Sequence, residues 1–183
     1  YMRAIRDADR IDFPDRVRLY NLYIDLLNTD AHLNAVINKR RAALLDLPIV
    51  FRRNDRIDES VQRHIRSPWF NDFIIDVLDA KLWGFSLFQF RLDGEWIGYD
   101  LIPRKHVDTI RRTILMREQN LTGTSWDEFA DLLFVGKPRD MGLLAQVAPY
   151  AIYKRNCLGY YAQYAELFGQ PIREGTYDIY NEE

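Results

Sequence analysis

The sequence predicts a single α+β domain in which long helices pack on a small antiparallel sheet. Apolar residues recur at helical spacing in three stretches, 14–45, 69–83 and 150–168. An Asp-Gly pair at Asp93-Gly94 separates two apolar runs, which predicts a β-hairpin. Helices combined with an antiparallel hairpin are typical of the α+β class.

The chain of 183 residues shows no internal repeat, low-complexity tract or second domain boundary. We therefore expect one domain over residues 14–178. Residues 1–13 are charge-rich and aperiodic, which predicts an N-terminal arm or linker, and 179–183 are expected to be a truncated tail. The chain opens on Tyr1 rather than Met and ends in a polar stretch, so we expect a fragment of a longer protein.

The first helix is expected to start at Pro14 with Asp15. Its apolar stripe continues to about Leu45, and Asp30 and His32 interrupt it without any Gly or Pro. The pattern then predicts a strand, a short helix and a longer helix. These cover, in order, residues 48–53, 55–66 and 69–83.

The limits of the longer helix are marked by local signals. Ser67 is a suitable N-cap, Pro68 suits the first helical position, and Gly84 ends the helix. The hairpin strands should follow at Phe85–Phe90 and Trp96–Ile102. Further elements are expected as a strand in 110–116, a loop over 117–128, a short buried strand at Asp131–Val135 and a turn at 136–138.

The last predicted helix, Tyr150–Phe168, is rich in aromatic residues. Pro149 is expected to open it, because proline suits a first turn better than a helix interior. Gly169 is expected to end it in a left-handed cap, and Pro171 should prevent continuation. We expect this helix to lie at the centre of the subunit. We expect the side chains of Leu158, Tyr161 and Phe168 to be buried, and we expect Cys157 to be an inert core thiol.

The composition is that of an ordinary globular protein, with 48% apolar and 28% charged residues. A net charge of −2 argues against a general nucleic-acid-binding protein. Arginines make up 20 of the 25 basic residues, which indicates either interfaces or a genomic composition bias. One cysteine excludes an intrachain disulfide, and no apolar run is long enough for a membrane span.

The sequence offers no catalytic, cofactor-binding or metal-binding residues. Neither the three histidines, His32, His64 and His106, nor Cys157 belongs to a ligand set, and no phosphate-binding loop or nucleophile elbow exists. Glu166 has no visible catalytic partner. We therefore expect no enzyme, no cofactor and no metal.

Basic residues form only short, separated clusters. Surface solvation or salt bridges between subunits explain them better than a continuous phosphate-binding stripe does. The clusters are Lys39-Arg40-Arg41, Arg52-Arg53 and Arg111-Arg112.

Three passages, in the right order over about residues 14–178, resemble the Mu-like prophage portal family. The first is LYNLYIDLLNTDAHLNAVINKRRAALLDLPIVF, a helix with a basic cluster and a short strand after proline. The second is a helix end, a hairpin and Leu-Ile-Pro-Arg, with matching residues Asp79, Ala80, Gly84, Phe85, Ser86, Phe90, Gly94, Leu101, Ile102, Pro103 and Arg104. The third matches at Gly142, Leu143, Leu144, Lys154, Glu166, Phe168, Gly169, Pro171, Arg173 and Gly175. Tyr160 and Tyr161 stand where the family usually has a mid-helix aromatic such as Trp.

The resemblance implies a portal wing-like fold and a structural subunit of a phage or prophage portal. Such subunits form a ring, usually of twelve copies, at one capsid vertex, and DNA is packaged and ejected through it. The implied partners are further copies of the chain, the terminase large subunit, capsid and head-completion proteins, and double-stranded DNA that passes non-specifically. The implied location is the virion capsid vertex, with host cytoplasm during assembly and no membrane.

Two alternatives stay open from the residues alone. The chain could be a small intracellular α+β enzyme with a site built from scattered polar residues, or a monomeric interaction module that docks through its aromatic helix.

Overall fold

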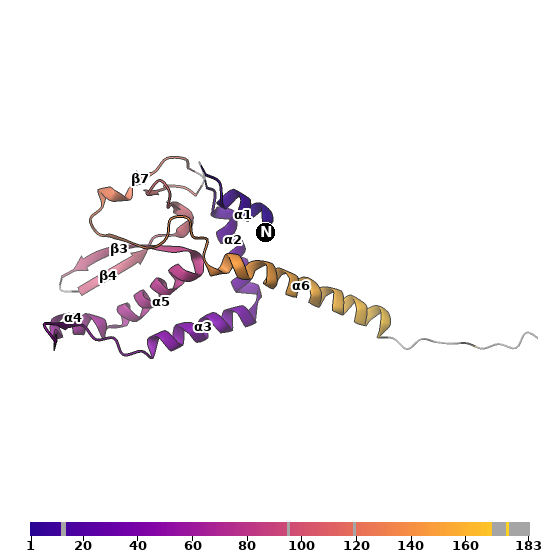
Figure 1. Ribbon diagram of the computed structural model, residues 1–183, viewed down its shortest axis with the longest axis horizontal. Helices are drawn as coiled ribbons and strands as arrows, with labels where there is room; N and C mark the ends of the chain where they lie inside the picture. The colour runs from indigo at the N-terminus through magenta and orange to yellow at the C-terminus, as the bar shows by residue number, and fades with distance from the viewer. Residues whose placement is uncertain (12–13, 95, 119, 170–174, 176–183) are drawn as a thin grey trace, which may run out of the picture.

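The computed structural model describes residues 1–11, 14–94, 96–118, 120–169 and 175, and these form the predicted α+β fold (Figure 1). The described helices are α1 (Met2–Ala8), α2 (Val17–Thr29), α3 (Ala31–Leu45), α4 (Glu59–Ile65), α5 (Pro68–Trp83) and α6 (Leu143–Phe168). The strands are β1 (Arg52–Arg53), β2 (Arg56–Ile57), β3 (Phe85–Asp93), β4 (Trp96–Leu101), β5 (Val107–Asp108), β6 (Thr113–Ile114), β7 (Thr124–Ser125) and β8 (Leu132–Gly136). They form three small antiparallel sheets, and the 3-10 turns η1 (Arg104–His106) and η2 (Trp126–Glu128) complete the described elements.

The core lies between α2 and a three-stranded sheet of order β4-β3-β8. On α2, Leu19, Tyr20 and Tyr23 are fully buried. The Tyr20 ring lies 6.1 Å from Trp83 and 6.2 Å from Phe85, measured between ring centroids. Because α2 makes these contacts, it occupies the centre of the subunit that we expected the last helix to fill.

The predicted hairpin is confirmed, with its turn one residue later than expected. β3 pairs with β4 from Phe88↔Leu101 to Asp93↔Trp96, so Asp93 belongs to the strand rather than to the turn. Gly94 has a φ of 63°, a left-handed conformation that favours glycine. On its other side β3 pairs with β8, which confirms the short strand expected near residues 131–135.

Asp30 divides the long helix expected between residues 14 and 45. Its backbone is extended (φ −100°, ψ 92°), and its side chain accepts a 3.0 Å hydrogen bond from the backbone N–H of Leu33. Asp30 is therefore the N-cap of α3. The interruption seen in the sequence at Asp30 marks a true helix boundary.

The N-terminal residues form α1, although we expected an aperiodic arm. Ala4 and Ala8 are buried in the core, and Asp7 pairs with Arg18 of α2 at 2.8 Å. Alanine side chains leave too weak an apolar period for sequence reading to detect such a helix.

The strand expected at residues 48–53 forms only over its last two residues, as β1. A two-residue turn joins it to β2, and both turn residues, Asn54 (φ 51°) and Asp55 (φ 61°), have the positive φ that a type I′ turn requires. The strand expected in 110–116 shrinks to β6, and the expected loop at 117–128 contains β7 and η2.

The limits of α5 are as predicted. Ser67 precedes the helix in an extended conformation, Pro68 is its first residue, and Gly84 follows it with a φ of 100°. A Cβ atom at Gly84 would lie 2.1 Å from the Asp140 carbonyl oxygen, so glycine also permits the close approach of the segment that leads into α6.

The long helix differs most from its prediction. α6 begins at Leu143 after Gly142, which places Pro149 inside the helix. Gly169 is right-handed (φ −74°, ψ −10°), so the expected left-handed cap is wrong. Pro171 and the rest of 170–174 and 176–183 lie outside the described residues.

Candidate functional site

The outer half of α6 is exposed on all sides. From Tyr153 to Phe168 each residue is exposed, and Figure 1 shows this part of the helix extending away from the body. The side chains expected in the core, Leu158, Tyr161 and Phe168, are 63%, 71% and 68% exposed, and Cys157 is exposed as well. The burial predictions were therefore wrong, because a periodic apolar face shows amphipathicity but not what covers it.

The inner part of α6 packs against the body through one stripe of the helix. Leu144, Ala148 and Ala151 are buried there, and they follow one another at spacings of four and three residues. The same spacing continues outward through Arg155, Gly159, Ala162 and Glu166. On this side of the helix, the apolar residues that contact the body are therefore followed by small or polar residues where α6 has left the body.

The aromatic residues occupy the opposite side of α6. Helical spacing places them on one face, which we call the aromatic face: Tyr150, Tyr153, Tyr160, Tyr161, Tyr164 and Phe168. All six are 60–75% exposed, and the rings of Tyr164 and Phe168 contact each other in a tilted arrangement with their centroids 4.9 Å apart. An apolar face of this size on a monomer is typical of a surface that another protein covers.

The base of α6 is fixed by hydrogen bonds to the segment before it. The buried Arg16 side chain donates to the Pro138 carbonyl at 2.8 Å and to the Asp140 carbonyl at 3.3 Å. The Tyr23 hydroxyl donates to the Met141 carbonyl at 2.8 Å. These contacts tie the start of the helix to α2, so α6 leaves the body in a defined direction.

One ion pair holds α6 at the point where it leaves the body. The Lys154 ammonium lies 2.6 Å from both carboxylate oxygens of Asp30. The hydrogen bond from Lys154, followed by that from the Leu33 N–H, lowers the pKa of the Asp30 carboxyl below its ordinary value. Asp30 thus both caps α3 and binds α6.

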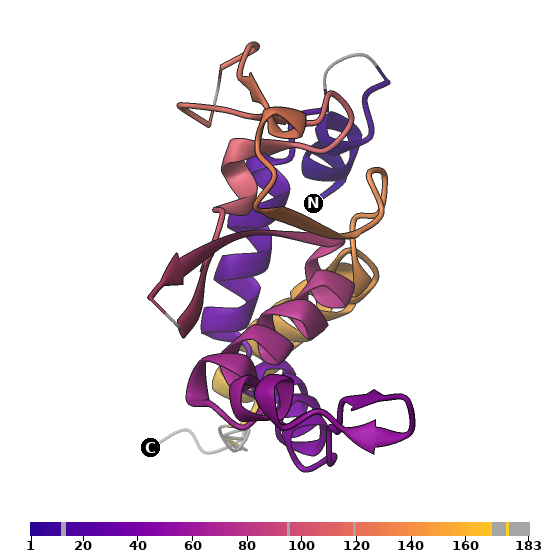
Figure 2. The ribbon, with the colours of Figure 1, turned by 90° about the vertical axis from the view of Figure 1, so that its left-hand side faces the viewer.

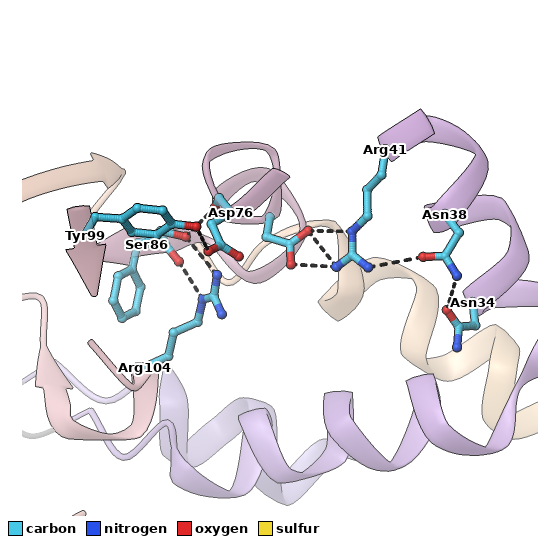
Figure 3. A network of polar contacts seen from close by, with 9 residues as sticks. Asn34, Asn38, Arg41, Asp76, Ser86, Tyr99 and Arg104 are labelled. Carbon is cyan, nitrogen blue, oxygen red and sulfur yellow. Dashed lines mark hydrogen bonds and ion pairs between the residues drawn. The ribbon is translucent and has the colours of Figure 1, made fainter. Parts of the chain in front are cut away.

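A polar network crosses from α3 through α5 to the sheet (Figure 3). Arg41 of α3 donates from Nε and Nη2 to the buried carboxylate of Asp79, with its shortest contact at 2.6 Å. Bidentate pairing of this kind fixes orientation as well as charge. Within the basic cluster at residues 39–41, Arg41 therefore makes an internal contact.

The second half of the network centres on Asp76 of α5. Its carboxylate accepts a 2.7 Å hydrogen bond from the Tyr99 hydroxyl, and its backbone carbonyl accepts one from Ser86. Burial raises the pKa of the Asp76 carboxyl, and the Tyr99 hydrogen bond opposes that shift. Arg104 donates to Ser86 Oγ and to the Phe85 carbonyl, and it lies over the Trp83 ring. Because these groups meet one another's hydrogen-bonding needs, the network stabilises the fold.

The histidines and Glu166, the side chains considered for catalysis or metal binding, each lie in a separate local environment. His106 Nδ1 contacts the Leu115 carbonyl at 2.9 Å, His64 lies beside the Trp96 ring, and His32 and Glu166 are exposed. Within the described ranges no group of three His, Cys, Asp or Glu side chains could hold a metal ion. None of the helices described is both long and apolar enough to cross a membrane.

The other basic clusters are engaged in local contacts. Arg53 pairs with Asp58 at 3.3 Å, and Arg111 donates to the Leu121 carbonyl at 2.7 Å. Arg112 pairs with Asp127 and lies over the Trp126 ring. These contacts agree with surface salt bridges rather than a phosphate-binding stripe.

Several cavities open on the described surface, and two of them are large enough to hold a side chain. One, of about 260 Å³, lies near the start of α2 and η1 and is lined by mixed charges that include Arg16, Asp15 and Lys105. The other, of about 160 Å³, lies between α3, α4 and α5, and apolar side chains line it together with Gln62, Arg66 and Asn71. Sequence reading found neither, because each joins segments that are far apart in the chain.

Known proteins resemble this chain along nearly its whole length. The model of the family described as "Portal protein of Mu bacteriophage" matches residues 20–183. The chain is 24% identical over 198 residues to the "Portal protein" of Escherichia phage Mu and 25% identical over 198 residues to the "Mu-like prophage FluMu protein gp29" of Haemophilus influenzae. Each comparison covers 96% of this chain and 38% of the relative, so the chain spans well under half of their length. The chain belongs to the Mu bacteriophage portal protein family.

Proposed function

We propose that this chain is part of a structural subunit of a phage or prophage portal ring, which forms the conduit for DNA at the capsid vertex. The observation that carries the proposal is the outer half of α6, an aromatic helix exposed on all sides in a chain of the portal family. Isolated helices of this length are marginal in water, so another protein surface must cover it in the working state.

The energetics favour assembly through this helix. Full burial of a Tyr, Leu or Phe side chain contributes about 1.5–3 kcal/mol. Eight large apolar side chains between Tyr150 and Phe168 are 60% exposed or more. Their burial between subunits would supply a substantial association energy, which is what a stable ring requires.

The charge suits a conduit through which DNA slides. Each phosphate contact adds affinity and salt dependence, which would hinder translocation. The net charge of −2 and the locally paired basic clusters keep such contacts few. We propose that double-stranded DNA passes non-specifically and that the role is structural rather than enzymatic.

The remaining partners follow from the same proposal. The full-length protein would form a ring of about twelve copies, bind the terminase large subunit during packaging, and contact capsid and head-completion proteins. It would occupy the virion capsid vertex after assembly in the host cytoplasm.

The test uses the full-length protein. Electron microscopy and mass measurement should show a ring, and Tyr161→Glu on the aromatic face should abolish it. Gln163→Glu, on the opposite face of the same turn, is the matched control and should leave the ring intact. Both residues are exposed, so neither substitution should change the melting temperature of the unassembled subunit. A wild-type protein that stays monomeric at high concentration would overturn the proposal.

The exposed aromatic face also favours one other function, a monomeric interaction module. In that case the wild-type protein would stay monomeric, and Tyr161→Glu would abolish binding of a different partner. The mass of the full-length protein in solution separates the two functions.

A further inference from the structure

We propose that the last turn of α6 binds in the cavity between α3, α4 and α5 of a neighbouring copy of the same chain. The inference rests on the proposed ring and names the two surfaces that would meet in it. It commits to a second copy as the occupant, because the two surfaces complement each other in polarity and charge and cannot meet within one molecule.

The cavity is an open groove that combines apolar side chains with the polar residues Gln62, Arg66 and Asn71. Its volume is about 160 Å³, and its apolar lining includes Leu44, Leu47, Ile49, Ile65, Phe70 and Ile74. Leu47 is 58% exposed, so the groove continues onto an apolar rim. A partner could therefore bury apolar area both inside the groove and along its edge.

One wall of the groove is held in shape by Gln62. This buried side chain donates from Nε2 to the Ile49 carbonyl at 3.0 Å, and its Oε1 accepts from the Phe51 N–H at 3.0 Å. The two bonds fix the segment after α3, although that segment forms no strand there. The groove is thus preformed, which lowers the entropic cost of binding.

The charges at the two surfaces are complementary. Arg66 lines the groove, and no acidic residue is among the described residues that line it with Arg66. The pairing of Arg66 with Glu59, at 3.8 Å between exposed side chains, is weak. Glu166 is the one charged residue in the last turn of α6, beside Leu167 and Phe168, and it has no ion-pair partner within the described part of the chain.

The two surfaces lie at opposite ends of the molecule. Figure 1 shows α6 leaving the body on the side opposite α4, and Figure 2 looks along that direction, with α6 running away from the viewer behind the body. Contact between them is therefore head-to-tail. Such heterologous contacts close into a ring when the rotation between copies permits it.

The first test is a cross-link in the full-length protein, with native cysteines replaced by serine. Leu167→Cys combined with Leu47→Cys should form a disulfide between subunits under mild oxidation. Leu167→Cys combined with Leu121→Cys is the control, because Leu121 is similarly exposed but lies outside the groove. A ladder of oligomers is expected for the first pair and not for the second.

The second test is a charge exchange. Glu166→Arg or Arg66→Glu alone should reduce the fraction of ring at least several-fold, and the double variant should restore it. Arg117→Glu controls for the change in net charge. Wild-type rings without the 47–167 cross-link, together with single variants that assemble normally, would overturn this contact and leave the proposed function standing. A monomeric wild-type protein would overturn both.

Discussion

The Tyr1 hydroxyl donates a hydrogen bond to the Ala145 carbonyl at 3.1 Å. In a regular helix the N–H of residue 149 would donate to this carbonyl, but Pro149 has no N–H. The Tyr1 hydroxyl thus donates to a backbone carbonyl for which the proline supplies no donor. This explains how α6 runs through Pro149, where the sequence predicted that the helix would begin.

This pair can be tested by a double-mutant cycle. Tyr1→Phe should lower the free energy of unfolding by about 0.5–1 kcal/mol, because it removes one hydrogen bond. In the Pro149→Ala background the same change should cost close to nothing, since the restored N–H satisfies the carbonyl. Chemical denaturation measures both values, and Tyr160→Phe, which removes an exposed hydroxyl, is the control. Equal costs in both backgrounds would refute the coupling.

Truncation of the last aromatic residue should leave the subunit stable. Phe168 is 68% exposed, so we expect Phe168→Ala to change the midpoint of chemical denaturation little. Leu19→Ala should cost about 2–5 kcal/mol, because Leu19 is fully buried in α2. The comparison is made on the unassembled subunit. A large loss for Phe168→Ala would restore the original expectation of a core helix.

The hairpin turn should depend on glycine at position 94. A β-branched side chain at a φ of 63° is strained by about 1–2 kcal/mol, so Gly94→Val should lower the melting temperature. Gly94→Asn should be milder, because Asn tolerates the left-handed region. No Cβ contact would block either residue, so strain alone is compared. Identical melting curves for the two variants would show that φ does not limit this turn.

The contact between Asp30 and Lys154 should contribute acid-dependent stability. The folded-state pKa of Asp30 is lowered, so its stabilisation is fully present above the unfolded-state pKa of about 3.9 and is lost as the pH falls through the lower folded value. Lys154→Met should make the decline in unfolding free energy below about pH 4 shallower.

Asp30→Asn separates the two functions of this residue. Asn remains a good N-cap but cannot form the ion pair, so this variant should resemble Lys154→Met in its pH dependence. Unfolding measured across the pH range checks both variants. A wild-type pH profile in both would show that the ion pair does not affect stability.

Local signals in the sequence predicted the framework well. Ser67-Pro68 and Gly84 mark the ends of α5, and Gly94 marks the hairpin turn one residue later than expected, because each signal acts through the conformation of its own backbone. The two-residue turn at Asn54-Asp55 carried a similar signal that could have been used.

Contacts between distant segments could not be predicted in this way. Arg41 and Asp79 are 38 residues apart, and no local pattern joins them. The position of α6 was missed for a related reason. Its period reveals an apolar face, but no segment among the described residues covers that face, so the core assignment of Tyr161 failed.

The close approach of Gly84 to the Asp140 carbonyl packs the segment before α6 tightly against the end of α5. Gly142 meets the Leu82 carbonyl in the same way, so the end of α5 and the start of α6 have no room to slide past each other. The helix beyond Tyr153 rises about 1.5 Å per residue and therefore acts as a lever on the order of 24 Å long. A rotation of about 10° at its root would move its tip by about 4 Å, roughly the spacing of atoms in contact. In the proposed ring, the tight packing at these two glycines would set the angular tolerance with which neighbouring copies can be joined.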